Sequence, residues 1–355
     1  MFNSLFISGR EYTYQRNQVI IRALRRLGTV KLPHIKSTSI TQRTICSLIA
    51  YLKSKEKFDF ITIGFYAHLI MCSFGILSHP PILLDIFLST FDTLCFDRRI
   101  CKPNSLLGIL SYYLDYFSCK LANYILLDTK SHIKYFVDTF NLCEKKFAAI
   151  PVGCNEDIFY PRKIVIKKSP SLVVLYYSTY LPLHGVDIVV KTAKELANIN
   201  DIQFRLIGNG PTFSKIDEMV KNFGLKNVEL VPTLPIQELA IEIAEADICL
   251  GGHFGESDKA KRVIPGKIYQ ILASEKPLIA ADTTANRELL IHGENALLCP
   301  ARDYKRLAEM IKMCYENRTT LVEIAKAGRQ LYLEKCSESI ITDKIKNIIQ
   351  AELLA

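Results

Sequence analysis

Two consecutive series of alternating strand-like and helix-like segments constrain the fold of this chain more than any other feature. Short runs rich in β-branched and aromatic residues alternate with longer stretches of helical period throughout the chain. This alternation is typical of a parallel sheet with helices on both faces. A turn-rich stretch, AAIPVGCNEDIFYPRK at residues 148–163, separates the two series. The pattern predicts an α/β chain with two Rossmann-like, doubly wound domains facing across a cleft.

The expected elements follow directly from these runs. In the first series we expect strands at 4–8, 59–64, 81–87 and 124–129, and helices at 18–28 and 106–123. In the second we expect strands at 171–178, 202–208, 228–233, 247–252, 276–282 and 296–300, and helices at 186–199, 213–224, 236–246 and 267–274.

The length supports two domains, because 355 residues exceed what one hydrophobic core usually organises. We expect an N-terminal domain at 1–160 and a C-terminal domain at 161–335. A final helix within 336–355 is expected to pack back across their junction.

The segment 60–84 contains no Asp, Glu, Lys or Arg, and it is about as long as a membrane span. It also contains His68, His79 and the pair Pro80-Pro81. A buried strand-helix-strand unit is therefore the favoured interpretation, since a parallel strand covered on both faces is continuously apolar.

Cysteine usage and the N-terminus both favour a cytoplasmic protein. Eleven cysteines occur without a close CxxC pair, and an odd count argues against a complete disulfide framework. The first residues lack the charged start and long apolar core of a signal peptide.

The net charge of +9 is concentrated in the first half, where residues 1–160 carry 19 Lys and Arg against 12 Asp and Glu. The motifs RALRRLG and DRRICK could adsorb to an anionic membrane surface at the inner face of the plasma membrane. A solvated helix face is the alternative, and it is slightly favoured. Nucleic acid is not an expected partner, because no binding motif accompanies the charge.

Several common site motifs do not occur. The chain has no GxGxxG, no GxxxxGK[ST], no HExxH, no paired Cys/His set and no GxSxG. The sequence therefore does not support a nicotinamide-dependent dehydrogenase, a P-loop nucleotide-binding protein, a zinc site or a serine hydrolase with a nucleophile elbow.

The stretch GGHFGESDKAKRVIPGKIYQ at 251–270 predicts an anion site. It gathers cations on a Gly/Pro loop that leads into a helix, and backbone N–H groups at a helix start complement a phosphate. Pro265 is expected to open that helix. Lys267 would then lie near the positive helix end, where a cation is disfavoured unless an anion binds there. A solvated surface loop is the alternative.

Polar residues also follow the other expected strands, where ligands bind in open parallel sheets. In the first series these include Gly9, Arg10, Arg16, Asn17, Asp85, Ser89, Asp92, Asp128, Thr129 and His132. For any single residue, a turn or a helix cap is at least as good an explanation. The position of all these residues after strands is stronger evidence for a ligand site than any one of them alone.

The motifs of the second half occur in a recognisable order. They are LVVLYYSTYLPLHGVDIVVKTAKEL, RLIGNGP, ADICLG, IPGKIYQILASEKPLIAAD, RELLIHGENALLCP and DYKRLAEMI. This half resembles the nucleotide-sugar-binding domain of family 4 glycosyltransferases, which have the GT-B fold. AAIPVGCNEDIFYP resembles the interdomain stretch of that family. The first half is similar more loosely, through FISGREYTYQRN, LLDIFLSTFDT and LLDT.

The resemblance implies transfer of a hexose or related sugar from a nucleoside diphosphate donor to a polysaccharide, lipid-linked or other acceptor, with retention of configuration. It implies no cofactor and no obligatory metal. The family is described through front-face attack, in which the donor phosphate assists deprotonation of the acceptor, so no nucleophile is assigned.

The expected site combines the cationic loop, the polar residues at strand ends and the positions that match the family pattern. Expected catalytic residues are Glu256, Arg262 and Lys267. Expected donor-binding residues are Gly9, Arg10, His184, Gly208, Gly210, Lys259, Lys261, Pro265 and Gln270. Expected acceptor-side residues are Arg16, Asp85, Asp128 and His132.

The chain departs from the family pattern at the donor site. Gln270 stands where many members have a ribose-contacting glutamate, and Arg262 stands eight positions before it, where a second glutamate is usual. Thr179 and His184 replace an Arg and a Lys that serve the diphosphate. Glu256 either contacts the sugar hydroxyls or is a solvated loop acid paired with a lysine.

Two rival functions therefore stay open beside the transferase. One is a sugar-nucleotide epimerase or phosphorylase on the same fold. The other is a catalytically weakened binding subunit, which the departures at Gln270, Thr179 and His184 motivate.

Overall fold

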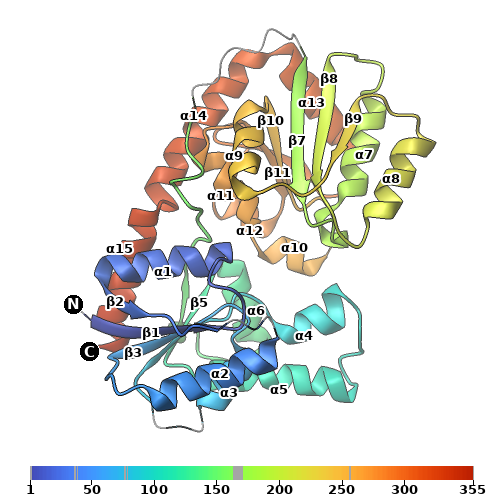
Figure 1. Cartoon of the computed structure of the whole chain (residues 1–355). Helices are drawn as coiled ribbons and strands as arrows, with labels where there is room; N and C mark the ends of the chain where they lie inside the picture. Colours follow the sequence, from blue (N-terminus) through green and yellow to red (C-terminus); the bar gives the residue numbers. More distant parts are fainter. Residues whose placement is uncertain are drawn as a thin grey trace. The chain divides into compact units, whose positions relative to one another are not determined.

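The computed structural model describes residues 2–35, 37, 39–75, 77, 79–162, 171–255 and 257–354. The chain divides into two compact units, Met1–Gly153 with Cys336–Ala355, and Cys154–Lys335 (Figure 1). The chain thus passes from one unit to the other after Gly153, and the C-terminal segment belongs to the first unit.

The first unit is a six-stranded parallel sheet in the order β2-β1-β3-β4-β5-β6. Its elements are β1 (Phe2–Ser8), α1 (Gln15–Leu27), β2 (Gly28–Lys31), α2 (Ile40–Lys53), β3 (Phe60–Gly64), α3 (His68–Phe74), β4 (Ile82–Asp85), α4 (Thr90–Asp92), η1 (Thr93–Asp97), α5 (Leu106–Leu121), β5 (Tyr124–Leu127), α6 (Lys130–Phe140), η2 (Glu144–Lys146), β6 (Phe147–Ala149), α15 (Glu338–Ile348) and η4 (Ile349–Leu353).

Alternate residues of the strands supply two cores, one on each face of this sheet. Leu5 and Ile7 pack with residues of α3, α5 and α6, whereas Phe6 packs with α1 and α15. The C-terminal helix thereby completes the first unit, and its Glu338 pairs with Arg22 and Arg26 of α1 at 3.2 and 2.7 Å.

The second unit is also a six-stranded parallel sheet, in the order β12-β11-β10-β7-β8-β9. Its elements are β7 (Leu172–Ser178), η3 (Pro182–His184), α7 (Val186–Glu195), β8 (Ile202–Gly208), α8 (Phe213–Asn222), β9 (Val228–Val231), α9 (Ile236–Glu245), β10 (Ile248–Gly252), α10 (Asp258–Arg262), α11 (Gly266–Ala273), β11 (Leu278–Asp282), α12 (Thr284–Arg287), β12 (Leu297–Pro300), α13 (Tyr304–Glu316) and α14 (Arg318–Lys335).

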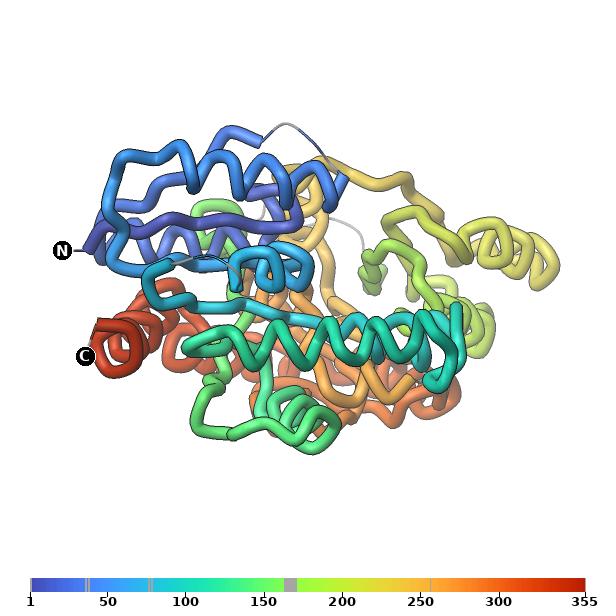
Figure 2. Tube along the Cα trace, turned by 90° about the horizontal axis from the view of Figure 1, so that it is seen from below, coloured from blue at the N-terminus to red at the C-terminus, as the bar shows by residue number. Residues whose placement is uncertain are grey.

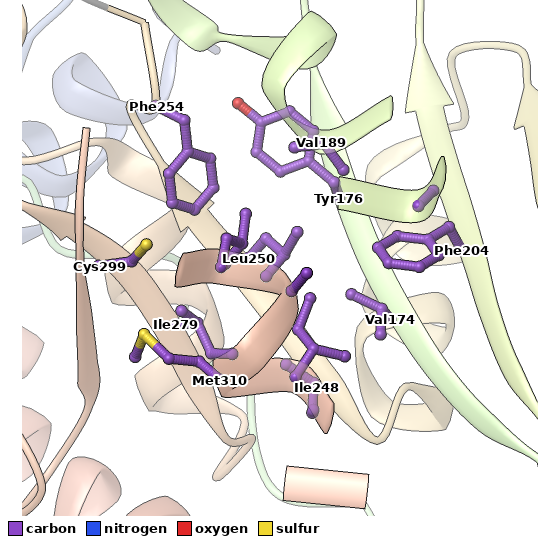
Figure 3. Close-up of a cluster of buried hydrophobic side chains, with 14 of the residues drawn as sticks. Val174, Tyr176, Val189, Phe204, Ile248, Leu250, Phe254, Ile279, Cys299 and Met310 are labelled. Atoms are coloured by element: carbon purple, nitrogen blue, oxygen red, sulfur yellow. The ribbon is translucent and has the colours of Figure 1, made fainter. Parts of the chain in front are cut away.

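The core of the second unit forms where β7, β8 and β10 meet the helices α7 and α13. Val174, Ile248 and Leu250 lie at its centre, with Met310 from α13 and Val189 from α7 (Figure 3). Side chains from distant parts of the sequence therefore hold the neighbouring strands β7 and β10 together.

The expected α/β class and all ten expected strands are confirmed, as are the six expected helices. Segment 60–84 is β3, α3 and β4, and no helix in the described parts is long and apolar enough to cross a membrane. The strands β2 and β6 were not expected. Both lie at the ends of the sheet order and are only four and three residues long, so they lack the apolar run that marks a buried strand.

Candidate functional site

The order of the second sheet places its topological switch point between β7 and β10. β8 and β9 continue the sheet on one side of β7, whereas β10, β11 and β12 continue it on the other (Figure 1). Ligands of open parallel sheets bind at the carboxyl ends of the strands at such a point. The loops after β7 and β10 therefore form the candidate site of this unit.

Backbone contacts join these two loops tightly. Phe254 N donates to His184 O at 3.3 Å, and Gly255 N donates to Leu183 O at 3.1 Å. Gly185 has a φ of +68°, and a Cβ there would overlap the backbone of Phe254 and Gly255. Only glycine satisfies both the left-handed conformation and this close approach.

Lys267 reaches this point from the first turn of α11. Its Nζ donates to the carbonyl oxygen of Tyr177 at 2.6 Å and lies 4.1 Å from the ring centroid of Tyr176. Burial lowers the pKa of Lys267 to about 7, because desolvation penalises the ammonium form. The expected position of this lysine at the helix start is confirmed, with Pro265 as the residue preceding Gly266, the first of the helix.

Two histidines stack beside this lysine. The rings of His184 and His253 have centroids 5.2 Å apart and an interplanar angle of 22°. Burial, and then the charge of Lys267, lower the pKa of His184 to about 3. Burial lowers the pKa of His253 as well, with smaller contributions from His184, Lys267 and Lys259. Both rings are therefore neutral at ordinary pH.

The polar edges of the two rings differ in their hydrogen bonding. His184 Nδ1 accepts from Leu181 N at 3.3 Å. His253 is 8% exposed, and its buried Nδ1 makes no hydrogen bond with the described residues. A buried polar atom without a partner is uncommon and points to a ligand contact.

Gln270 is held inside the unit. It is 5% exposed, and its Oε1 accepts from the hydroxyl of Tyr177 at 2.7 Å. In this conformation the side chain supports the end of β7, so direct contact with a ribose stays a prediction.

The remaining cations of the 251–270 loop lie on the short helix α10. Lys261 is exposed and pairs with Asp258 at 3.0 Å, whereas Lys259 and Arg262 are half-buried. Lys259 is close enough to contribute to the lowered pKa of His253. Glu256 lies outside the described residues, so its expected role stays a prediction.

Gly208 and Gly210 make room for the loop after β7. Their φ angles are +134° and +154°, and a Cβ on either would overlap the carbonyl oxygen of Ser178 or Thr179. Thr179 is itself exposed. The two glycines therefore set the path of the backbone at the site, and donor contact stays a prediction for them.

In the first unit the switch point lies between β1 and β3. Gly9 follows β1, its N donates to Phe65 O at 3.0 Å, and a Cβ there would overlap the backbone of Tyr66. Arg10 is exposed and pairs with Glu11 at 3.2 Å. Gly9 thus packs the two loops together, while Arg10 points to solvent.

Arg16 and Asp85 form an ion pair at 2.9 Å in which both side chains are 0% exposed. Arg16 also donates to Ile150 O at 2.6 Å and Pro151 O at 2.9 Å. This network ties the end of β4 to the loop after β6. The pair is structural in this conformation, and contact of either residue with an acceptor stays a prediction.

Asp128 and His132 are also buried. Asp128 Oδ1 lies 2.7 Å from His132 Nδ1, one helical turn later, and Thr129 caps α6 by accepting from His132 N at 3.0 Å. Both side chains are buried in this conformation, so their contact with an acceptor stays a prediction.

Sequence reasoning missed His253, Tyr176, Tyr177 and Gly185 as site residues. His253 follows β10 immediately, which was a usable signal. The tyrosines belong to an apolar strand run, so no pattern distinguishes them from core residues. Within the described ranges, no group of three His, Cys, Asp or Glu side chains is placed to hold a metal ion.

Solved structures of other proteins share the fold of this chain. The chain is similar to HepE of Anabaena in complex with UDP and glucose, with a TM-score of 0.75, 13% identity, and coverage of 99% of this chain and 100% of that one. It is also similar to sucrose-phosphate synthase of Thermosynechococcus elongatus, with a TM-score of 0.77, 14% identity, and coverage of 98% of both chains. The chain has the GT-B fold.

The second unit of this GT-B chain carries the family match. Residues 171–317 match the model described as glycosyl transferases group 1. An uncharacterized glycosyltransferase of Methanocaldococcus jannaschii is 28% identical over 188 residues, which are 52% of this chain and 49% of that protein. The GT-B chain thus matches about half the length of this curated relative.

Proposed function

We propose that this GT-B chain is a glycosyltransferase that uses a nucleoside diphosphate sugar. The observation that carries the proposal is Lys267, a half-buried lysine in the first turn of α11 at the switch point of the second sheet. The match of residues 171–317 to group 1 glycosyl transferases supports the same conclusion.

A diphosphate is the ligand that best complements this place. Burial holds the pKa of Lys267 at about 7, so an adjacent anion would restore its positive charge. The helices α7 and α11 both begin here, at Val186 and Gly266, and helix starts favour negative charge. His253 Nδ1 offers a further polar contact.

In the proposed reaction the bond between the sugar and the diphosphate breaks, and the acceptor oxygen bonds to the sugar carbon. The acceptor proton passes to the departing phosphate, and configuration is retained. Lys267, with Arg262 and Lys259 of the neighbouring helix α10, stabilises the charge that develops on the leaving group. These cations provide the stabilisation that a metal supplies elsewhere, so we propose that no metal is required.

The proposed donor is a sugar linked to UDP or a related nucleotide, because the similar HepE structure contains UDP and glucose. The proposed acceptor is a glycan or a lipid-linked glycan. Arg10, exposed after β1, keeps its expected role in binding the donor as a prediction.

A binding subunit with weak catalysis is the second candidate, and one observation favours it. Gln270 accepts from the Tyr177 hydroxyl, whereas the family glutamate at this position contacts ribose. If Gln270 keeps this hydrogen bond when nucleotide binds, its side chain does not contact the ribose, and the donor is held by fewer contacts than in the family.

A panel of nucleoside diphosphate sugars tests the proposal. Thermal stabilisation and sugar release are measured for each donor, with and without chelator, on the natural chain, Lys267→Met and Lys261→Met. We expect one donor to stabilise and turn over without metal, and Lys267→Met to lose about 10- to 100-fold in affinity. Lys261→Met is the comparison, because Lys261 is exposed and paired with Asp258, and an unchanged affinity would remove it from the expected donor-binding residues.

Three results separate the alternatives. If no donor raises the thermal stability of the chain, the proposed transferase activity is contradicted. Stabilisation without turnover favours the binding subunit. Loss of turnover on chelation overturns the metal-free mechanism.

A further inference from the structure

Helix α5 of the first unit has its apolar face on the outside. The side chains at Leu106, Leu110, Tyr113, Phe117 and Leu121 repeat at helical spacing, and all are 39–76% exposed. The fully buried residues of α5 are instead small or polar, namely Gly108, Ser111, Asp115, Ser118 and Cys119, and only Tyr112 and Tyr116 add partly buried aromatic rings to the core. This is the reverse of a normal surface helix, whose apolar stripe faces the core.

Polar contacts lock α5 in this orientation. Asp115 is 0% exposed and accepts from the Ser89 hydroxyl at 2.6 Å and from the backbone N–H groups of Thr90 and Phe91 at 3.0 and 2.9 Å. Its Oδ1 also lies 3.2 Å from His68 Nε2. Rotating the helix to bury its leucines would expose this network, so the outward apolar face is a property of the folded unit.

Helix α2 has a similar distribution, although its Leu48 and Tyr51 are partly buried against the core. Its Arg43, Thr44 and Ser47 are buried, and Arg43 donates to Ser8 O at 3.0 Å and Arg10 O at 2.9 Å. Its exposed side carries an apolar stripe of Ile45, Ile49 and Leu52.

These two helices belong to one layer of the first unit. α3 contacts both α2 and α5, and the three helices run beneath the sheet in Figure 1 and side by side in Figure 2. Among the described residues, thirteen of the twenty-one exposed large apolar side chains lie between Ile45 and Leu121. We call the outer side of α2, α3 and α5 the apolar face. A patch concentrated in this way marks an interaction site.

The charges beside α5 indicate what kind of partner fits. Arg98, Arg99, Lys102 and Lys120 are exposed next to the apolar stripe. The acids of 86–121 are Asp92, Asp97 and Asp115, of which Asp92 and Asp115 are buried and Asp97 is half-buried. Every fully exposed charge along this stretch is therefore positive.

We propose that the apolar face docks onto the surface of an anionic lipid bilayer. The leucine, isoleucine and aromatic side chains enter the boundary between headgroups and acyl chains, and the flanking cations contact lipid phosphates. α5 has 16 residues, which span only about 24 Å, so it lies in the interface and does not cross the bilayer. A second copy of this chain would bring the same cations together, which like-charge repulsion opposes.

The site differs from the one that the RALRRLG motif suggested. Arg22 and Arg26 of that motif pair with Glu338 of α15, so they are engaged within the unit. The DRRICK motif, in contrast, leads into α5 and supplies Arg98, Arg99 and Lys102 to the apolar face.

Vesicle sedimentation of the full chain tests the apolar part of the proposal. Vesicles are made of phosphatidylcholine alone or of an equal mixture with phosphatidylglycerol. We expect the natural chain to bind the anionic vesicles, and Leu110→Glu with Phe117→Glu to reduce the partition coefficient by on the order of tenfold or more. Ile241→Glu is the matched control, since Ile241 is similarly exposed on α9 of the other unit and should leave binding unchanged.

Separate variants test the contribution of the cations to vesicle binding. Arg98→Gln and Arg99→Gln should each weaken binding to anionic vesicles by about fivefold and leave the thermal midpoint unchanged. The chain has no tryptophan, so Tyr113→Trp on α5 introduces a single fluorescent reporter. Its emission should shift to the blue with anionic vesicles, whereas Tyr160→Trp in the other unit should not respond.

Three results would overturn the proposal. These are no binding to either vesicle, equal binding to neutral and anionic vesicles, and a dimer in solution that Leu110→Glu dissociates without vesicle binding. The measurements use neither donor nor acceptor, so their failure is independent of the proposed transferase activity.

Discussion

Lys267 donates a hydrogen bond of 2.6 Å from Nζ to the backbone carbonyl oxygen of Tyr177. This bond fastens the first turn of α11 to the carboxyl end of β7. The amine is thereby held at the switch point of the second sheet, although burial lowers its pKa to about 7. A half-buried amine whose protonated form is disfavoured gains its charge more readily when an anion binds beside it.

Nucleotide binding should take up a proton at pH 8. Free Lys267 is mostly neutral there, because its pKa is about 7, and a diphosphate beside it raises that pKa. The affinity for UDP should fall by up to about tenfold per pH unit above pH 7. Calorimetry in two buffers of different ionisation enthalpy measures the uptake, and Lys267→Met should abolish the part due to this residue.

The same lysine predicts the direction of stability with pH. Its pKa is lowered from 10.5 on folding, so between about pH 7 and 10.5 the unfolded chain binds more protons. This contribution to the unfolding free energy therefore increases with pH in that window, by at most about 1.4 kcal/mol per unit. Urea denaturation of the natural chain and Lys267→Met at pH 7 and 9 isolates it. An equal pH response in both proteins would contradict the assignment.

His253→Phe should separate stability from binding. The phenyl ring keeps the stack on His184 and removes a buried nitrogen that has no partner among the described residues. The unfolding free energy should increase by about 1 kcal/mol, while the affinity for UDP falls by about five- to tenfold. Unchanged affinity would show that His253 does not contact the nucleotide.

Gly185→Ala should disrupt the site through the backbone. The left-handed φ of +68° and the overlap with Gly255 both oppose a Cβ, so a loss of about 2–4 kcal/mol is expected. Gly224→Ala is the matched control, because Gly224 has a φ of +61° with nothing within 4 Å. It should cost only about 1 kcal/mol. Similar losses in both variants would argue against the close loop contact.

The buried pair Arg16 and Asp85 should behave as a coupled unit. Asp85→Leu leaves a guanidinium buried without its carboxylate and should destabilise the chain by about 3–5 kcal/mol. Adding Arg16→Met should cost less than the sum of the single changes, with a coupling of about 2 kcal/mol or more in a double-mutant cycle. Additive losses would refute the pairing.

Part of the candidate site of the second unit was predictable from the order of strands and loops. Lys267 was expected at the start of a helix that follows a buried strand, and it lies there. The contact of Gln270 with Tyr177 was not predictable, because these residues are 93 positions apart and each belongs to an ordinary apolar segment. The burial of Asp85 was equally hidden, since an Asp after a strand is as compatible with a surface cap as with an ion pair.

The sequence by itself determined the α/β class, the two series of parallel strands and the position of the cationic loop, because hydrophobic period and turn residues act locally. Only the tertiary structure decided that His253 and Lys267 share one buried place and that α5 turns its leucines outward. Periodicity shows that two sides of a helix differ in polarity. Which side faces the core depends on partners such as His68 and Ser89, which are brought to Asp115 by folding.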